Sequence, residues 1–298
     1  MRGDKSFENA AALLPRGIRE AFLSLGAAEM EQAEEFRLRS GSRPAVLLPE
    51  GERELGTREV TPEDLASLIE TATHGSAHTA LALVRAGYVP LAGGCRLGLC
   101  GEMTAGADGE LALRRLSSAA VRIARERRCC GDALRRALFS GGFRDTLIVS
   151  PPGAGKTTLL REMVRLLSES GERVAVADER GEIAAVSGGR AHFDVGPCTD
   201  VMTGAPKADA ALMLIRSMNP TVLAMDEITS AGDVEAVMGA AGCGVRLIAT
   251  AHGGGVGSLR RRGLYRRLLD EGIFARFVSV RRRADGIREY EGKELDGL

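Results

Sequence analysis

The sequence predicts an α/β protein whose C-terminal half forms a mainly parallel sheet, preceded by a smaller α+β domain. In the C-terminal half, short apolar runs alternate with helix-like runs across brief loops, which is the pattern of βαβ units. The N-terminal part instead mixes short helices with glycine-rich turns. A chain of 298 residues with 44% hydrophobic content can fill two cores. We therefore expect domains at residues 1–135 and 136–298.

Strands and helices are expected to alternate through the C-terminal half. The expected strands are short and apolar, at residues 146–149, 173–177, 221–225, 245–249 and 275–280. Apolar side chains at helical spacing predict helices at 157–168, 208–217, 231–241 and 258–271. A longer loop separates the second strand from the second helix, so the predicted order is a strand–helix repeat with one insertion.

The N-terminal domain offers two local signals. Thr61 and Pro62 are typical of a helix cap and first turn, and they predict a helix over 61–73. Residues 87–102 contain short β-like segments separated by glycines, which permit tight turns. The domain boundary is expected between residues 130 and 143, where an arginine-rich segment gives way to a short helix and two glycines.

Charge and hydropathy limit the classes of function. The chain has 40 basic and 40 acidic residues, so nothing at whole-chain level demands nucleic acid or an anionic membrane as partner. No apolar run reaches the ~18 residues of a membrane-spanning helix, so we expect a cytoplasmic protein. The C-terminal part is locally basic, because residues 256–290 contain ten arginines and four acidic residues.

A phosphate-binding motif occupies residues 150–157. They match G-x-x-x-x-G-K-[ST] except at the first position, where Ser150 replaces glycine, and they lie between a predicted strand and a predicted helix. Backbone N–H groups and the positive helix end favour the phosphates of ATP, which Lys156 can also reach. Thr157 offers a hydroxyl to Mg²⁺. The residues expected to bind the nucleotide are Pro151, Pro152, Gly153, Ala154, Gly155, Lys156, Thr157 and Thr158.

Two acids follow the third expected strand of this half. Asp226 is expected to hold Mg²⁺ together with Thr157, and Glu227 to orient or deprotonate the attacking water. The fourth strand ends in Thr250 and His252, which would face the γ-phosphate if that strand lay between the first and the third. These residues extend the prediction from triphosphate binding to hydrolysis.

Other charged residues leave two interpretations open. Glu179 follows the second strand, where acids face the ligand crevice, so it is a candidate for supporting the water or the metal. Arg180 and Glu182 beside it equally suit a solvated ion pair. Phosphoryl transfer also gains from a cation that neutralises the γ-phosphate. The candidates for that cation, each of which also suits ordinary surface charge, are Arg96, Arg122, Arg125 and Arg216.

The whole chain resembles the stage III sporulation protein AA family of spore-forming bacteria. The stretches that carry the resemblance cover both expected domains, at residues 93–102, 121–126, 178–183, 193–196, 199–201, 206–207, 214–220 and 224–227. That family is similar to the hexameric traffic ATPases of type II and type IV secretion, in which a histidine segment like Thr250 to His252 follows the Walker B strand. Two positions depart from the pattern: Ser150 in the phosphate motif, and Cys95 where a histidine is expected beside Arg96.

The resemblance implies a RecA-like P-loop ATPase core behind a mobile N-terminal domain, with ATP and Mg²⁺ as cofactors. It also implies a homo-oligomer in the form of a hexameric ring. The ring would be cytoplasmic and recruited to a membrane by an integral membrane component of a secretion-like complex. Its work would be to energise a channel from the mother cell into the forespore.

Two other functions compete with this interpretation. A nucleic-acid-dependent P-loop ATPase would grip phosphates with the arginine-rich C-terminal part, but the zero net charge, the absence of Trp and the 4% aromatic content argue against it. A small-molecule kinase would have a similar phosphate site. The sequence offers that kinase no recognisable lid or acceptor pocket, and the pair Asp226 and Glu227 favours water as the acceptor.

Overall fold

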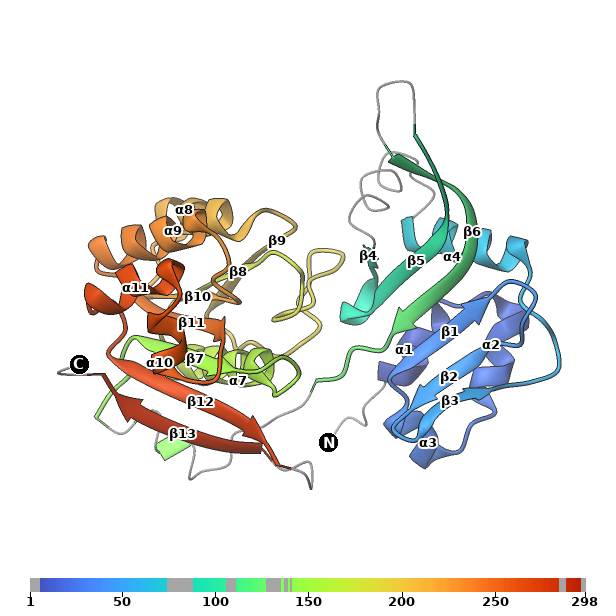
Figure 1. Ribbon diagram of the computed structural model, residues 1–298, viewed down its shortest axis with the longest axis horizontal. Helices are drawn as coiled ribbons and strands as arrows, with labels where there is room; N and C mark the ends of the chain where they lie inside the picture. Colours follow the sequence, from blue (N-terminus) through green and yellow to red (C-terminus); the bar gives the residue numbers. More distant parts are fainter. Residues whose placement is uncertain are drawn as a thin grey trace. The chain divides into compact units, whose positions relative to one another are not determined.

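The chain forms two compact units (Figure 1), described here from a computed structural model covering residues 6–73, 88–105, 111–126, 135–136, 139, 141–283 and 288–295. One unit comprises Met1–Glu126 with Ala185–His192, and the other comprises Arg127–Ala184 with Phe193–Leu298. The boundary predicted between residues 135 and 136 falls in a stretch most of which lies outside the described residues.

The first unit is built on an antiparallel sheet, in agreement with the predicted α+β domain. Its strand order is β3-β2-β1-β6-β5-β4, and every neighbouring pair runs antiparallel. The strands are β1 (Glu35–Arg39), β2 (Ala45–Leu48), β3 (Gly51–Glu54), β4 (Tyr88–Pro90), β5 (Arg96–Ala105) and β6 (Leu111–Arg122). The helices are α1 (Ser6–Ala12), α2 (Arg16–Leu23), α3 (Ala27–Gln32), α4 (Pro62–Thr73) and the short 3₁₀ helix η1 (Ala92–Gly94).

Aromatic packing joins the first helices to this sheet. Phe36 and Leu38 of β1 are fully buried, whereas the alternating residues are not. The Phe36 ring lies edge-on to Phe7 of α1, with centroids 5.1 Å apart, and 4.4 Å from the centroid of Phe22 in α2. Burial of large aromatic surface supplies much of the stability of a small core. One face of the sheet is thus covered by helices.

The predicted start of α4 is confirmed. The Thr61 N–H donates to Asp64 Oδ2 at 2.8 Å, and the Asp64 N–H donates to Thr61 Oγ1 at 3.3 Å. This reciprocal pair satisfies N–H groups that the first helical turn leaves free. The glycine-rich stretch agrees with the prediction in part: Gly93 and Gly94 have positive φ and lie in the turn η1 between β4 and β5, but β5 then continues through Gly101 as one long strand. A Cβ on Gly101 would lie 2.0 Å from the Arg115 carbonyl oxygen, so this glycine permits close strand approach rather than a turn.

The second unit has the predicted mainly parallel sheet. Its strand order is β13-β12-β7-β11-β10-β8-β9, parallel throughout except for the edge pair β12 and β13. The strands are β7 (Thr146–Ser150), β8 (Val174–Asp178), β9 (Thr199–Thr203), β10 (Val222–Met225), β11 (Arg246–His252), β12 (Arg276–Arg282) and β13 (Arg288–Glu294). The helices are α7 (Lys156–Glu169), α8 (Lys207–Met218), α9 (Ala231–Gly242), α10 (Val256–Arg260) and α11 (Gly263–Asp270).

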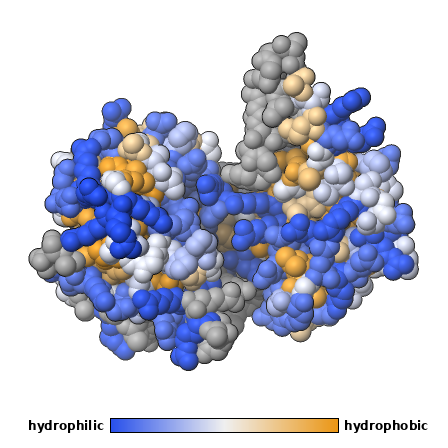
Figure 2. Space-filling model, in the orientation of Figure 1, coloured by the Kyte–Doolittle hydropathy of each residue, from blue (hydrophilic) through white to orange (hydrophobic). Residues whose placement is uncertain are grey.

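Helices cover both faces of this sheet. Alternate residues of β7, β8, β10 and β11 form one core with α8, α9, α10 and α11. Helix α7 packs against β7, β8 and β11 and contributes nothing to that core, so it covers the other face. The four central strands are buried along nearly their whole length, as expected for parallel strands between two helical layers. Most of the surface visible in Figure 2 is hydrophilic.

Two edge strands and one helix break differ from the predictions. Strands β9 and β13 are only partly buried and carry few apolar residues, so hydrophobic patterning could not reveal them. The helix predicted over 258–271 is two helices, because Arg262 has an extended backbone (φ −98°, ψ 118°) between α10 and α11. Among the described residues, no helix is both long and apolar enough to cross a membrane.

Candidate active site

The predicted phosphate loop joins β7 to α7 at the carboxyl edge of the parallel sheet. Gly153 (φ 73°) and Gly155 (φ 108°) have left-handed backbones, which side chains with a Cβ rarely adopt. Ser150 has no such conformation: it is the last residue of β7, and its hydroxyl donates to the Pro151 carbonyl at 3.0 Å. Serine at the first motif position is therefore compatible with the loop. Thr158 lies in the first turn of α7.

The side chain of Lys156 points to the neighbouring strand ends. Its Nζ lies 2.9 Å from His252 Nδ1 and 3.7 Å from Glu227 Oε1, and the residue is almost fully buried. Burial lowers the pKa of Lys156 below the usual lysine value, and the carboxylates of Glu227 and Asp226 oppose that shift. A cation held in this way lies beside the loop that is shaped to hold phosphates.

The Asp226 carboxylate accepts hydrogen bonds from two hydroxyl groups. Thr157 Oγ1 donates to Asp226 Oδ2 at 3.0 Å, and Thr250 Oγ1 donates to Asp226 Oδ1 at 2.6 Å. Burial raises the pKa of Asp226, while the two hydroxyl donors oppose the rise. A hydroxyl and a carboxylate at hydrogen-bond distance are the oxygen ligands that Mg²⁺ takes at phosphate sites. The predicted metal pair is thus close enough to act together.

Glu227 has a strained backbone, with φ at 45°, and such strain concentrates at functional sites. Its N–H donates to Thr250 Oγ1 at 2.9 Å, and the N–H of Ile228 donates to the Thr250 carbonyl at 3.0 Å. The Glu227 carboxylate contacts His252 Nε2. Strand β11 therefore contacts Glu227 both at its backbone, through Thr250, and at its carboxylate, through His252. Of these three residues, only Glu227 has a positive φ.

The contacts of His252 select one tautomer. An ammonium group can only donate, so His252 Nδ1 accepts from Lys156. The ring proton then lies on Nε2 and is donated to Glu227. Strand β11 lies between β7 and β10, which is the condition under which His252 was expected to face the phosphates, and this order explains why Lys156, Glu227 and His252 meet. This arrangement couples the phosphate-binding lysine to the acid through one imidazole.

The loop after β8 brings further acids to the same edge. The buried Asp178 carboxylate accepts the N–H groups of Glu182, Ile183 and Ala184, which shapes this loop. A recess here is lined by Ala177, Asp178, Glu179, Arg180, Glu182, Lys207, Asp226 and Glu227. Glu179 is therefore placed near the metal and water candidates, as expected from its position after a strand.

One candidate arginine, Arg216, belongs to the second unit, and the other three belong to the first. Arg216 is at the end of α8, beside Thr221 and Val245, which precede β10 and β11. This is the amino edge of the sheet, so the structure does not bring Arg216 to the phosphate loop of its own chain. The three N-terminal arginines belong to the first unit. Arg96 and Arg122 are cross-strand partners in β5 and β6, and Arg125 donates to the carbonyls of Met30 and Ala33 near the end of α3.

Two residues near the site escaped the sequence analysis. Arg288 of β13 donates from Nε to the Ala154 carbonyl at 3.2 Å and so contacts the phosphate loop. Its strand lacks an apolar pattern, so nothing in the sequence placed it there. Lys207 lines the acidic recess. Its only signal was its place in one of the stretches that carry the family resemblance.

Comparisons with known proteins identify the family of this chain. The family described as "Sporulation stage III, protein AA" matches residues 4–292. The chain belongs to this family. It is 33% identical over 277 residues to Stage III sporulation protein AA of Bacillus subtilis (strain 168), with 91% of this chain and 90% of the relative covered. The family predicted from the sequence is thereby confirmed.

Solved structures confirm the fold. The ATPase DotB of Legionella pneumophila superposes with a TM-score of 0.61 at 15% identity, covering 98% of this chain and 80% of DotB. The pilus retraction motor PilT with bound ADP superposes with a TM-score of 0.62 at 17% identity, covering 90% of this chain and 81% of PilT. The sporulation family member therefore has the fold of these traffic ATPases.

Thr250→Val should destabilise the site without changing its shape. Valine matches threonine in volume but leaves the Glu227 N–H and Asp226 Oδ1 without the Thr250 hydroxyl, in a fully buried position. An unsatisfied buried polar group costs about 1–3 kcal/mol. We expect that loss in the free energy of unfolding, measured by urea denaturation, together with loss of ATP turnover. Thr250→Ser keeps the hydroxyl and should retain most of both; equal effects of the two variants would contradict this role.

Gly155→Ala should disrupt the phosphate loop. An alanine there is strained at φ 108°, and its Cβ would lie 2.5 Å from Arg288 Nε. With alanine the free loop should relax out of this left-handed conformation, and restoring it on binding would cost about 1–2 kcal/mol, so ATP affinity should fall about tenfold. Titration calorimetry measures this change. The matched control is Gly242→Ala, which has open space and no positive φ, and its affinity should stay at the wild-type value.

Proposed function

We propose that this chain is a Mg²⁺-dependent ATPase that works as a ring and energises a secretion-like channel between mother cell and forespore. One observation carries the hydrolysis: three neighbouring strands deliver Lys156, Asp226, Glu227 and His252 to one edge of the sheet. There Lys156, Glu227 and His252 contact one another, and Asp226 accepts hydrogen bonds from Thr157 and Thr250. The expected task, to energise a channel, is supported by two findings: the fold that the chain shares with DotB and PilT, and its membership of the sporulation family.

The residues divide the work of phosphoryl transfer to water. The N–H groups of the loop from Gly153 to Thr157 hold the phosphates, and Lys156 neutralises charge on their oxygens. Thr157 and Asp226 would hold Mg²⁺, which when bound offsets the negative charge of the phosphates. Glu227 orients the attacking water and takes its proton.

His252 positions the acid for this step. Its Nε2–H restrains the Glu227 carboxylate, and its Nδ1 contacts the lysine that neutralises the phosphates. The imidazole therefore links the cation that binds phosphate to the base that activates water. We propose that His252, the last residue of β11, senses the presence of the γ-phosphate.

The surface of α8 supports a ring. Leu212, Met213 and Met218 are large hydrophobic residues of α8 that remain exposed, and exposed Arg216 lies three residues after Met213 on the same helix. Residues three or four apart share one side of a helix. We propose that this side contacts a neighbouring subunit and presents Arg216 to the neighbour's phosphates, since Arg216 is remote from its own chain's phosphate loop.

Mixing two inactive variants tests the ring. Arg216→Ala leaves Lys156 intact, and Lys156→Ala leaves Arg216 intact, so each subunit supplies what the other lacks. ATP turnover should reappear when the variants are mixed, and light scattering with ATP should show a mass near that of a hexamer of 31.5 kDa chains. An active wild-type protein that stays monomeric at every concentration would contradict the proposal that the protein works as a ring. Stimulation by DNA or RNA, weakened by salt, would instead support a nucleic-acid-dependent ATPase.

The membrane partner is a separate part of the proposal. We propose that an integral membrane component of the secretion-like complex recruits the ring. Vesicles that contain candidate membrane proteins from the same sporulation stage should raise ATP turnover, whereas vesicles of lipid alone should not. Equal turnover with both kinds of vesicle would remove the partner from the account.

A further inference from the structure

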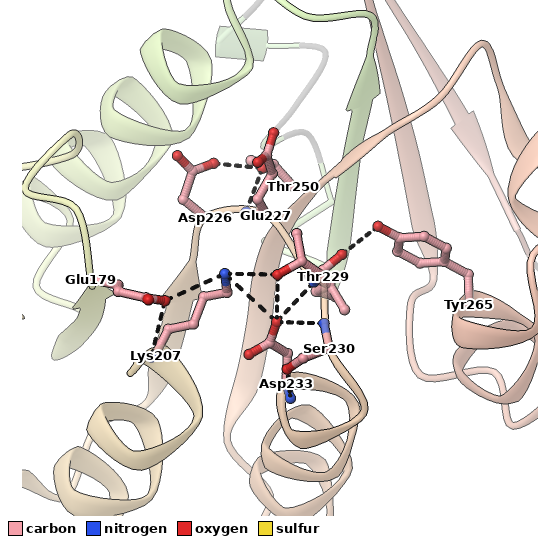
Figure 3. A network of polar contacts seen from close by, with 10 residues as sticks. Glu179, Lys207, Asp226, Glu227, Thr229, Ser230, Asp233, Thr250 and Tyr265 are labelled. Carbon is pink, nitrogen blue, oxygen red and sulfur yellow. Dashed lines mark hydrogen bonds and ion pairs between the residues drawn. The ribbon is translucent and has the colours of Figure 1, made fainter. Parts of the chain in front are cut away.

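Helix α8 begins with a lysine that is almost entirely buried, with 8% of its surface exposed. The Lys207 ammonium lies 3.2 Å from Thr229 Oγ1 and 3.6 Å from both Glu179 Oε2 and Asp233 Oδ2 (Figure 3). Its backbone N–H donates to Glu179 Oε2 at 3.4 Å. Lys207 therefore connects the loop after β8, which carries Glu179, to the loop after β10, which carries Asp226 and Glu227.

The loop after β10 is also held by its own contacts. Asp233 Oδ2 accepts the N–H groups of Thr229 and Ser230, at 2.8 and 3.0 Å, and the Asp233 N–H donates to Ser230 Oγ at 3.1 Å. The Tyr265 hydroxyl donates to the Ile228 carbonyl at 2.5 Å (Figure 3). Asp233 thus has donors besides the lysine, and this loop keeps its shape through several independent bonds.

Glu179 is in a different position. Among the residues that the structure describes, its carboxylate has polar contacts with Lys207 alone. Its side chain is 43% exposed, so water competes for it. Loss of the Lys207 ammonium would leave this carboxylate with the Lys207 backbone N–H, at 3.4 Å, as its remaining contact among the described residues.

The recess around these groups is strongly acidic. Asp178, Glu179, Glu182, Asp226 and Glu227 line it, with Lys207 and Arg180 as the cations among its lining residues. Like charges at such short range repel each other, and a buried ammonium offsets that repulsion more effectively than a solvated one. The Lys207 charge therefore allows Glu179 to stay at the recess instead of turning into solvent.

We propose that Lys207 is a positioning residue for the reaction: it holds the Glu179 carboxylate at the recess that contains Asp226 and Glu227. The inference rests on the proposed function, because Glu179 has a task only if phosphoryl transfer takes place there. Lys207 thereby sets the distance between the loops after β8 and β10. It does not place Lys207 in contact with the nucleotide.

Coupled substitutions separate positioning from a merely structural role. Lys207→Met and Glu179→Gln should each lower kcat on the order of tenfold to a hundredfold, while KM for ATP stays within about threefold. The double variant should be no slower than either single variant, because each removes the same held carboxylate. Lys293→Met, an exposed lysine far along the chain, is the control and should leave kcat unchanged. Multiplying losses in the double variant would overturn the proposal.

A second assay needs no nucleotide. Arg180 is exposed in the loop that carries Glu179, so trypsin cleavage after Arg180 reports how firmly that loop is held. Cleavage should be several-fold faster in Lys207→Met and Glu179→Gln than in wild type and in Asp233→Asn. Equal rates in all four proteins would reject the placement of Glu179 by Lys207. If wild type releases no phosphate from ATP, the proposed function fails, and the cleavage rates still decide whether Lys207 holds Glu179.

Discussion

Lys156→Ala should lower ATP turnover by at least ~10²- to 10³-fold, the loss expected when one preorganised charge that faces the reacting group is removed. Lys156 is a buried cation whose Nζ lies between His252 and Glu227, beside the phosphate loop. Alanine removes the charge and also deprives His252 Nδ1 of its donor. The effect should appear in both kcat and KM, because the same ammonium holds the ground-state phosphates and neutralises the transition state.

The control for this variant is Lys293→Ala. Lys293 lies on the edge strand β13 with its side chain 66% exposed, so its loss removes a lysine without touching the site. Turnover in that variant should match wild type. If Lys156→Ala kept wild-type turnover, the phosphate loop would not be the site of hydrolysis.

Glu227→Gln should abolish hydrolysis while ATP still binds. The amide is nearly isosteric with the carboxylate, and its oxygen can still accept the His252 Nε2–H, so the loop geometry is kept. An amide cannot take a proton from water, and loss of a general base typically costs about 10²- to 10⁴-fold. We expect kcat to fall by that factor. Equilibrium titration with ATP should give a wild-type dissociation constant.

Glu235→Gln is the matched control, since Glu235 lies on α9 with its side chain 64% exposed and pairs with Arg267 at the surface. It should hydrolyse ATP at the wild-type rate. A Glu227→Gln protein that turned over normally would assign the water to another acid, and Glu179 would then be the first to test.

Much of the second unit was predictable because its strands are buried on both sides. Continuous apolar runs revealed β7, β8, β10, β11 and β12, and polar residues at their carboxyl ends identified the acids of the site. The sequence left the strand order open: His252 would reach the phosphates only if β11 lay between β7 and β10, and the structure meets that condition. Here the chemistry and the burial pattern point to the same arrangement.

The elements that escaped prediction have a common physical reason. Strands β9 and β13 are held by backbone hydrogen bonds at the two sheet edges, and their side chains are mostly polar. Such strands have no hydrophobic period to detect. The contacts of Arg288 and Lys207 at the site were not predicted, because they join segments that are far apart in the chain. Arg216 lies at the edge of the sheet opposite its own chain's phosphate loop, so its role as a cation for phosphate stays a prediction that concerns a neighbouring subunit.

Phosphate release from ATP by the purified wild-type chain, with excess Mg²⁺ and again with a chelator, tests the central claim most directly. The account predicts release that requires Mg²⁺, disappears in Glu227→Gln, and transfers the phosphoryl group to water. Release that continued unchanged in the chelator, or no release in Mg²⁺ either alone or with the membrane partner, would contradict it.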